Sequence, residues 1–252
     1  MNLYLANNIF SKIFLSALPA DKNITPIFKD SALICSELEK DTSAVALIPT
    51  LELINHRALF VSSKIGISFD GPLSNSYLYF PDPEKSFTKL KVRGDISINE
   101  IILSKILFSE RYSTNIEITL DAGIELNNED VYLIMGNENF MSRDFSTGLS
   151  FSDMVAEMLD LPYVNFVFTS MDKESLAKFN GNFENIDINI EDNISSISDQ
   201  LEVSDEVKNY VKVNIGSLYF EMTDNEKVAV KELVKLIYYH GIIDDIFDIK
   251  FI

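Results

Sequence analysis

The sequence predicts an α/β fold of two lobes, in which the second lobe is inserted into the first and a ligand cleft lies between them. Short apolar runs typical of buried strands alternate with amphipathic helical segments along the 252 residues. A charged, proline-containing linker at 81–86 interrupts this alternation, and a long strand candidate at 161–170 leads back from the inserted part. These observations predict a first lobe of residues 1–80 and 166–252 and a second lobe of residues 81–165.

The run AVALIPT (44–50) is the clearest strand of the first lobe. Its apolar residues fit an interior strand covered on both faces, and Pro49 can end this strand because it has no N–H to donate. Ligands of open α/β sheets bind beyond the carboxyl ends of such strands, so Pro49 and Thr50 are expected at the cleft. Residues 7–12 are interpreted as a loop. Other strands are predicted at 3–6, 64–69 and 76–80, and a helix capped by Asp30 at 31–39.

The second lobe contains a strong helix signal. Ser97-Ile98-Asn99-Glu100 has the form of a capping box and predicts a helix over 98–110. After the turn Asp70-Gly71-Pro72, the chain is expected to cross between the lobes near 76–80 and to return near 162–168. Strands are predicted at 89–94, 115–120, 130–136 and 161–170, and a helix capped by Ser152 is predicted to end near Leu159.

The C-terminal part is predicted to be helical. Thr223-Asp224-Asn225-Glu226 forms another capping box, which opens a helix that runs to His240 with Gly241 at its C-terminal cap. Residues 181–193 have no clear periodicity. Further helices are predicted at 172–180, near 191–200 and at 204–212, and the apolar end of the chain is expected to dock.

Composition and charge exclude several classes of function. A net charge of −18 without a basic stripe opposes binding to nucleic acid and to anionic membranes. No apolar run is long enough for a membrane span, and a weak signal-peptide pattern favours a cytoplasmic location. The single Cys35 cannot form an intramolecular disulfide and is interpreted as a small core residue. His56 and His240 are too few for a multi-histidine metal site, and a histidine-based triad is not expected.

A series of segments resembles one enzyme family over nearly the whole chain, in the family's order. The segments are LYLAN (3–7), AVALIPT (44–50), GISFDGPLSNSYLYF (66–80), ILFSERY (106–112), DVYLIMGN (130–137), LPYVNFVF (161–168) and SLYFEMTDNEKVAVKELVKLIYYHGII (217–243). The sequence thereby resembles the chorismate dehydratases of the futalosine route of menaquinone biosynthesis. The resemblance implies a type II periplasmic-binding-protein-like fold and a cytoplasmic lyase. Such an enzyme converts chorismate into 3-[(1-carboxyvinyl)oxy]benzoate without a metal or organic cofactor.

The resemblance also implies a set of site residues. Asn7, Ser76 and Asn137 take the catalytic positions, and Asn8 competes with Asn7 for the asparagine that contacts substrate. The substrate-binding set is Asn8, Pro49, Thr50, Gly71, Pro72, Leu73, Ser74, Asn75, Ser97, Asn99, Glu100, Gly136, Leu161, Pro162 and Tyr163. The expected partner is a small anionic substrate, and the protein is expected to be a monomer or a homodimer. Asn7, Ser74 and Ser76 have an alternative interpretation as ordinary turn residues.

Three departures from the family pattern all fall on the ligand side. Ser97-Ile98-Asn99-Glu100 stands where the family has Ser-Arg-Thr-Ser, Gly136-Asn137 replaces Gly-Asp, and Leu159-Asp160 replaces Thr-Gly. Glu100 is expected to fold back onto the Ser97 backbone, where its carboxylate would repel a substrate carboxylate. Three hypotheses therefore stay open: a chorismate dehydratase, a non-catalytic or altered-specificity protein that binds small carboxylates, and a naphthoate synthase-like sister enzyme. Cations that could pair with a carboxylate are Arg57, Lys64, Arg93 and Arg143.

Overall fold

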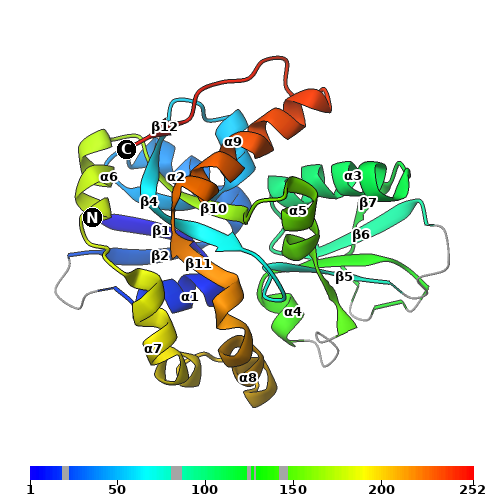
Figure 1. The fold of residues 1–252 in the computed structure, drawn as a ribbon, viewed down its shortest axis with the longest axis horizontal. Coiled ribbons are helices and arrows are strands. Elements are labelled where there is room, and N and C mark those ends of the chain that lie inside the picture. The colour runs from blue at the N-terminus through cyan, green and yellow to red at the C-terminus, as the bar shows by residue number, and fades with distance from the viewer. Residues whose placement is uncertain (19–22, 81–86, 124–125, 128, 142–146) are drawn as a thin grey trace.

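The computed structural model describes residues 1–18, 23–80, 87–123, 126–127, 129–141 and 147–252. These residues form two lobes, each built around its own β-sheet (Figure 1). The strands of the second sheet lie between β4 and β10 of the first in chain order, so the predicted insertion is confirmed. Both chain ends lie in the first lobe. The predicted linker at 81–86 lies outside the described residues.

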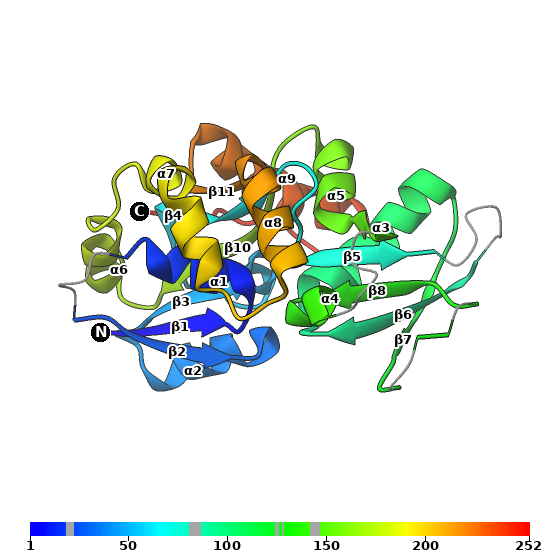
Figure 2. The ribbon, with the colours of Figure 1, turned by 90° about the horizontal axis from the view of Figure 1, so that it is seen from below.

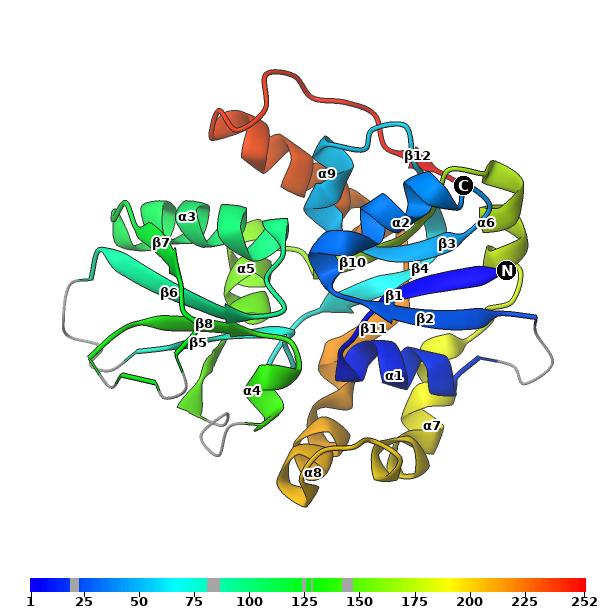
Figure 3. The same cartoon turned by 180° about the vertical axis from the view of Figure 1, so that it is seen from behind.

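The sheet of the first lobe has the order β2-β1-β3-β10-β4-β11, and β12 pairs with β4. Strands β1, β2 and β3 are parallel, whereas β10 runs antiparallel to both of its neighbours. Helices α2 and α9 lie on one face of this sheet and α1 and α7 on the other (Figures 1 and 3). The first-lobe strands are β1 (Asn2–Ala6), β2 (Thr25–Lys29), β3 (Val45–Pro49), β4 (Phe60–Phe69), β10 (Tyr163–Ser170), β11 (Leu218–Glu221) and β12 (Lys250–Phe251). The helices are α1 (Ile9–Ser16), η1 (Ser31–Leu33), α2 (Ile34–Lys40), η2 (Thr50–Ile54), α6 (Lys173–Asn180), α7 (Ile186–Asp199), α8 (Asp205–Asn214), η4 (Ile215–Ser217) and α9 (Asp224–Tyr239).

The sheet of the second lobe has the order β7-β6-β8-β5-β9. This order corresponds, strand for strand, to β2-β1-β3-β10-β4 of the first sheet. In each lobe, the strand by which the chain arrives from the other lobe, β5 or β10, runs antiparallel to a central parallel strand. Figure 2 shows the two sheets side by side along the long axis of the molecule. The second-lobe elements are β5 (Ser76–Tyr79), β6 (Lys89–Gly94), α3 (Ile98–Tyr112), β7 (Glu117–Leu120), β8 (Tyr132–Met135), α4 (Asn137–Met141), β9 (Leu149–Ser150) and α5 (Phe151–Leu159).

The crossings between the lobes differ from those predicted. Strand β5 pairs with β8 from Ser76↔Met135 to Tyr79↔Tyr132, so residues 76–79 belong to the second sheet and not to the first lobe. The chain therefore crosses at 70–75 and returns at 160–162, where Asp160 has a positive φ of 53°. Both crossings were predicted a few residues too late because an apolar strand pattern does not reveal the sheet to which the strand bonds.

The sequence missed several elements that belong to the first sheet or lie beside the cleft. Among them are α1, β2, α4, β11 and β12. The Asn8 side chain caps α1 by accepting from the Ser11 N–H. In the sequence, the polar residues around this cap were interpreted as a loop. Strand β2 is a half-exposed edge strand with Pro26 inside it, which gives no alternating pattern. Two cap predictions were also wrong: Asp30 makes no capping hydrogen bond, and Ser150, not Ser152, caps α5.

The apolar core joins the lobes on the side of η2 and α9. The core of the second lobe includes four buried side chains from first-lobe elements: Leu51, Tyr163, Leu233 and Ile237. The capping box at Thr223 and Glu226, which starts α9, is confirmed. Opening the lobes on this side would expose apolar surface, so the interface itself opposes a wide hinge motion. Among the described residues, every helix is too short or too polar to span a lipid bilayer.

Candidate functional site

A hydrogen bond joins two of the predicted catalytic residues, Asn7 and Asn137, at the lobe interface, and Ser76 lies on a strand paired with the residues that precede Asn137. The Asn137 Nδ2 donates to the backbone oxygen of Asn7 at 2.9 Å, which joins the start of α4 to the end of β1. The Gly136 N–H donates to the backbone oxygen of Asn75 at 2.7 Å, directly before Ser76. Gly136 adopts φ +67°, a conformation that favours glycine, and so lets the chain turn from β8 into α4.

Several buried polar atoms near these bonds have no hydrogen-bond partner in the described structure. They are Asn8 Nδ2, Ser11 Oγ, Asn75 Oδ1, Ser76 Oγ and Asn137 Oδ1. Asn8 lies just before α1 and Ser11 lies in it, Asn75 lies just before β5 and Ser76 begins it, and Asn137 begins α4. Unpaired buried polar atoms are costly and usually have a water or ligand partner. Each of these five residues, together called the polar cluster, therefore has an atom that can bond to water or to a ligand.

Most of the predicted Gly71–Ser74 segment has a structural role. The Ser74 Oγ donates to the Ser76 backbone oxygen at 2.6 Å and accepts from the Ser152 N–H at 3.1 Å. The Pro72 backbone oxygen accepts from the hydroxyl groups of Tyr77 and Tyr210, each at 3.0 Å. These contacts agree with the alternative interpretation of Ser74 as a structural turn residue.

On the other side of the interface, Asn99 bridges the lobes. Its Oδ1 accepts from the Leu51 N–H at 2.8 Å, and its Nδ2 donates to the Asn165 backbone oxygen at 2.7 Å. The Thr50 Oγ1 donates to the Val164 backbone oxygen at 2.7 Å. All of these polar groups are buried. Pro49 pairs with Phe166 inside the sheet, Leu161 and Pro162 lead into β10, and Tyr163 is fully buried.

Glu100 is completely buried at the start of α3. It does not return to the Ser97 backbone as predicted; instead its Oε2 accepts from the Ser97 hydroxyl at 2.5 Å. The Asn165 Nδ2 lies 3.5 Å from its other oxygen. Burial raises the pKa of the Glu100 carboxyl to about 7, and these hydrogen bonds only partly oppose the rise. The protein's own carboxyl group thus occupies the helix N-terminus that the family resemblance assigned to an anionic ligand.

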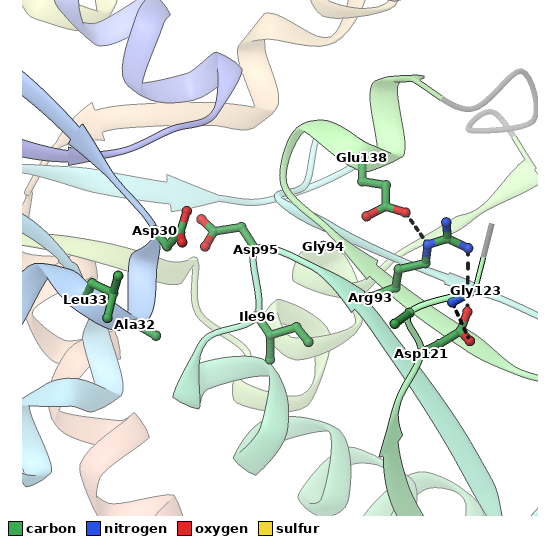
Figure 4. Close-up of a pocket in the computed structure, with 11 residues that line it drawn as sticks. Asp30, Ala32, Leu33, Arg93, Gly94, Asp95, Ile96, Asp121, Gly123 and Glu138 are labelled. Atoms are coloured by element: carbon green, nitrogen blue, oxygen red, sulfur yellow. Dashed lines mark hydrogen bonds and ion pairs between the residues drawn. The ribbon is translucent and has the colours of Figure 1, made fainter.

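A cavity of about 720 Å³ lies between the lobes (Figure 4). The first lobe contributes Asp30 and Leu33, and the second contributes Asp95, Asp121 and Glu138. In Figure 4 the carboxyl groups of Asp30 and Asp95 face each other from the two lobes. Burial raises the pKa of Asp95, and the neighbouring charge of Asp30 raises it slightly further. Hydrogen bonds to the Asp95 carboxyl from the Ser31 N–H at 2.8 Å and the Ser31 hydroxyl at 2.6 Å oppose this rise. No residue of the predicted catalytic or substrate-binding set lines this cavity.

Arg93 is the cation in the wall of this cavity, and carboxylates already surround it. Its Nη1 lies 3.5 Å from Asp121 Oδ2, and its Nε donates to Glu138. Gly94, next to it, has φ +93°, and a Cβ there would meet the Met135 backbone oxygen at 2.1 Å. Glycine is thus required where β6 runs into the cavity wall.

The sequence contained a signal for this cavity. Asp30 directly follows β2, Asp95 follows β6 and Asp121 follows β7, so each lies at the carboxyl end of a strand of a parallel pair. These are the positions at which ligands bind in such sheets. Of the other predicted cations, Arg57 pairs with Asp245, Lys64 borders a different pocket, and Arg143 lies outside the described residues.

Comparisons with known proteins support the fold. No protein-family model and no curated protein matches the chain. Among solved structures, protein AF1704 from Archaeoglobus fulgidus is similar with a TM-score of 0.61 at 13% identity, over 96% of this chain and 98% of that one. YhfZ from Shigella flexneri is similar with a TM-score of 0.53 at 13% identity, over 81% of this chain and 93% of that one. Together with the strand orders, these findings identify a two-lobed, type II periplasmic-binding-protein-like fold with a cleft between its lobes.

Proposed function

We propose that the protein is a binding protein for a small, positively charged molecule held in the acidic cavity between the lobes. The observation that carries this proposal is the pair Asp30 and Asp95, whose carboxyl groups face each other from opposite lobes. Neighbouring like charges repel each other, and a cation between them would turn the repulsion into attraction. The ligand would thereby add to the two hydrogen bonds from Ser31 to Asp95, which already join the lobes at this point.

The surrounding charges favour a cation over the small carboxylate expected from the family resemblance. Four carboxyl groups line the cavity, and Arg93 is already shared by two of them. The helix N-terminus at Ser97 holds the buried Glu100 in place of a ligand anion. A dicarboxylate such as chorismate would meet net negative charge in this cavity, so the proposal keeps the binding role of the second hypothesis but replaces its small carboxylate with a cation.

Two probes with the same carbon chain and opposite charge test the proposal. We expect 1,4-diaminobutane to raise the melting temperature and to give a binding isotherm, whereas succinate should do neither. Asp95→Asn should weaken diamine binding roughly tenfold or more, because it removes one of the two facing charges. The matched control is Asp244→Asn, the same charge change at an exposed residue, which should bind the diamine as the wild type does. Preferential binding of succinate, or an equal loss in the two variants, would disprove the proposal.

A second candidate function is the dehydration of chorismate, and the polar cluster favours it. Unpaired atoms of Asn8, Asn75, Ser76 and Asn137 coincide with positions that the family resemblance assigns to the substrate. Incubation with chorismate, followed by liquid chromatography and mass spectrometry, should then yield 3-[(1-carboxyvinyl)oxy]benzoate, one water molecule lighter than the substrate. Ser76→Ala should abolish this product with little change in melting temperature. The absence of product above the enzyme-free control would exclude this function and leave the binding proposal intact.

A further inference from the structure

Three potential metal ligands converge in the first lobe, away from the acidic cavity. Cys35 comes from α2, Glu52 from η2, and His56 from the turn that follows η2. One ligand atom from each of the three side chains lies within 4.8 Å of the others. The sequence did not reveal this group, because Cys35 lies on a different helix from the other two residues.

The local fold fixes this convergence. Helix α2 packs against β3, and η2 continues directly from β3, so the two segments lie next to each other. The Asn55 and His56 N–H groups both donate to the Glu52 backbone oxygen at 3.1 Å, which holds the turn closed. As a result, His56 Nε2 lies 3.8 Å from Glu52 Oε2.

The exposure of the three side chains suits a site that an ion can enter. Cys35 is buried at 7% relative exposure, whereas the Glu52 and His56 side chains are 15% and 27% exposed. The inner ligand is therefore shielded, and the outer two open toward solvent. Ligand atoms around a tetrahedral zinc ion lie about 3.5 Å apart, so small side-chain rotations would close the present arrangement around an ion.

We propose that Cys35, Glu52 and His56 form a binding site for a divalent zinc ion, with the fourth position left to water. Thiolate, carboxylate and imidazole are the ligand types that zinc uses, and three protein ligands plus water are typical of an open zinc site. The thiol and imidazole must bind without their protons, so zinc binding releases a proton from Cys35. The negative charges of the thiolate and of Glu52 then balance the charge of the ion.

A bound ion would connect the first lobe to the lobe interface. It would join α2 to η2, and η2 carries Leu51, whose N–H donates to Asn99 of the second lobe. This site shares no residue with the acidic cavity or the polar cluster. The inference is thus independent of the proposed function, and each can fail without the other.

Titration of the metal-free full-length protein with Co²⁺ tests the inference. Cobalt takes the place of zinc and absorbs visible light strongly when its coordination is tetrahedral. We expect one Co²⁺ per chain, a thiolate-to-cobalt charge-transfer band in the near ultraviolet, and loss of both signals on adding Zn²⁺. Because Cys35 is the only cysteine, that band can arise from no other residue.

Three variants separate this site from adventitious binding. Cys35→Ser should remove the charge-transfer band, and His56→Gln should weaken Co²⁺ binding at least about tenfold. His56→Gln also keeps the test decisive if Cys35→Ser fails to fold, because His56 lies near the surface. The matched control is His240→Gln, the other histidine of the chain, which pairs with Glu110 and should leave binding unchanged. Absence of the band in the wild type, or wild-type affinity in His56→Gln, would overturn the inference.

Discussion

Replacement of Asn99 by alanine is expected to lower the free energy of unfolding by roughly 2–5 kcal/mol, because it leaves two buried backbone groups unpaired. The Leu51 N–H loses its acceptor, and the Asn165 backbone oxygen loses a donor. Asn99 is fully buried, so water does not reach these groups without a change in packing. The two bonds connect α3 of the second lobe to η2 and β10 of the first, and the loss therefore falls on the lobe interface.

Equilibrium unfolding in urea measures this effect. The matched control is Asn193→Ala on α7, where the side chain is exposed and donates only to the Asn189 backbone oxygen within its own helix. That change should alter the free energy of unfolding by about 0.5 kcal/mol or less. A loss below about 1 kcal/mol in Asn99→Ala would show that Asn99 does not hold the lobes together.

Replacement of Glu100 by glutamine is expected to raise stability above neutral pH and to flatten its dependence on pH. The Glu100 carboxyl has a pKa of about 7 in the folded chain, against an ordinary value of 4.5. The folded state therefore binds the proton more tightly, and its stability falls as pH rises from about 4.5 to about 7. Over that window the penalty grows to roughly 3 kcal/mol, and glutamine removes it because it cannot ionise.

The measurement is the difference in unfolding free energy between wild type and Glu100→Gln from pH 5 to pH 8. Burial also raises the pKa of Asp187, to about 6, but this contribution is the same in both proteins and cancels in the difference. Glu184→Gln provides the control, since it makes the same charge change at an exposed residue. A difference that stays constant from pH 5 to pH 8 would contradict the prediction, because it would mean that ionisation of Glu100 does not destabilise the folded protein.

The sequence predicted the candidate site only in part. The resemblance selected Asn7, Ser76 and Asn137. In the structure, Asn137 donates to Asn7, and the residue before Asn137 donates to the residue before Ser76. The acidic cavity was missed, although Asp95 and Asp121 follow predicted strands, because β2 had no recognisable pattern and Asp30 was interpreted as a helix cap. An acidic residue after one strand reads as ordinary surface. It becomes part of a site only when a second carboxyl group faces it from the other lobe.

By itself, the sequence determined the α/β class, the inserted second lobe and most helices and strands. Those features depend on apolar periodicity and on caps, which act between residues close in the chain. Only the tertiary structure decided that β5 bonds into the second sheet and that Glu100 lies inside the protein. It also decided that Asn99 reaches Leu51, a contact between residues 48 positions apart. Such pairings depend on how whole elements pack against each other. The local pattern at Ser97–Glu100 predicts a helix start, but it predicts this equally well whether the Glu100 carboxylate faces water or the core.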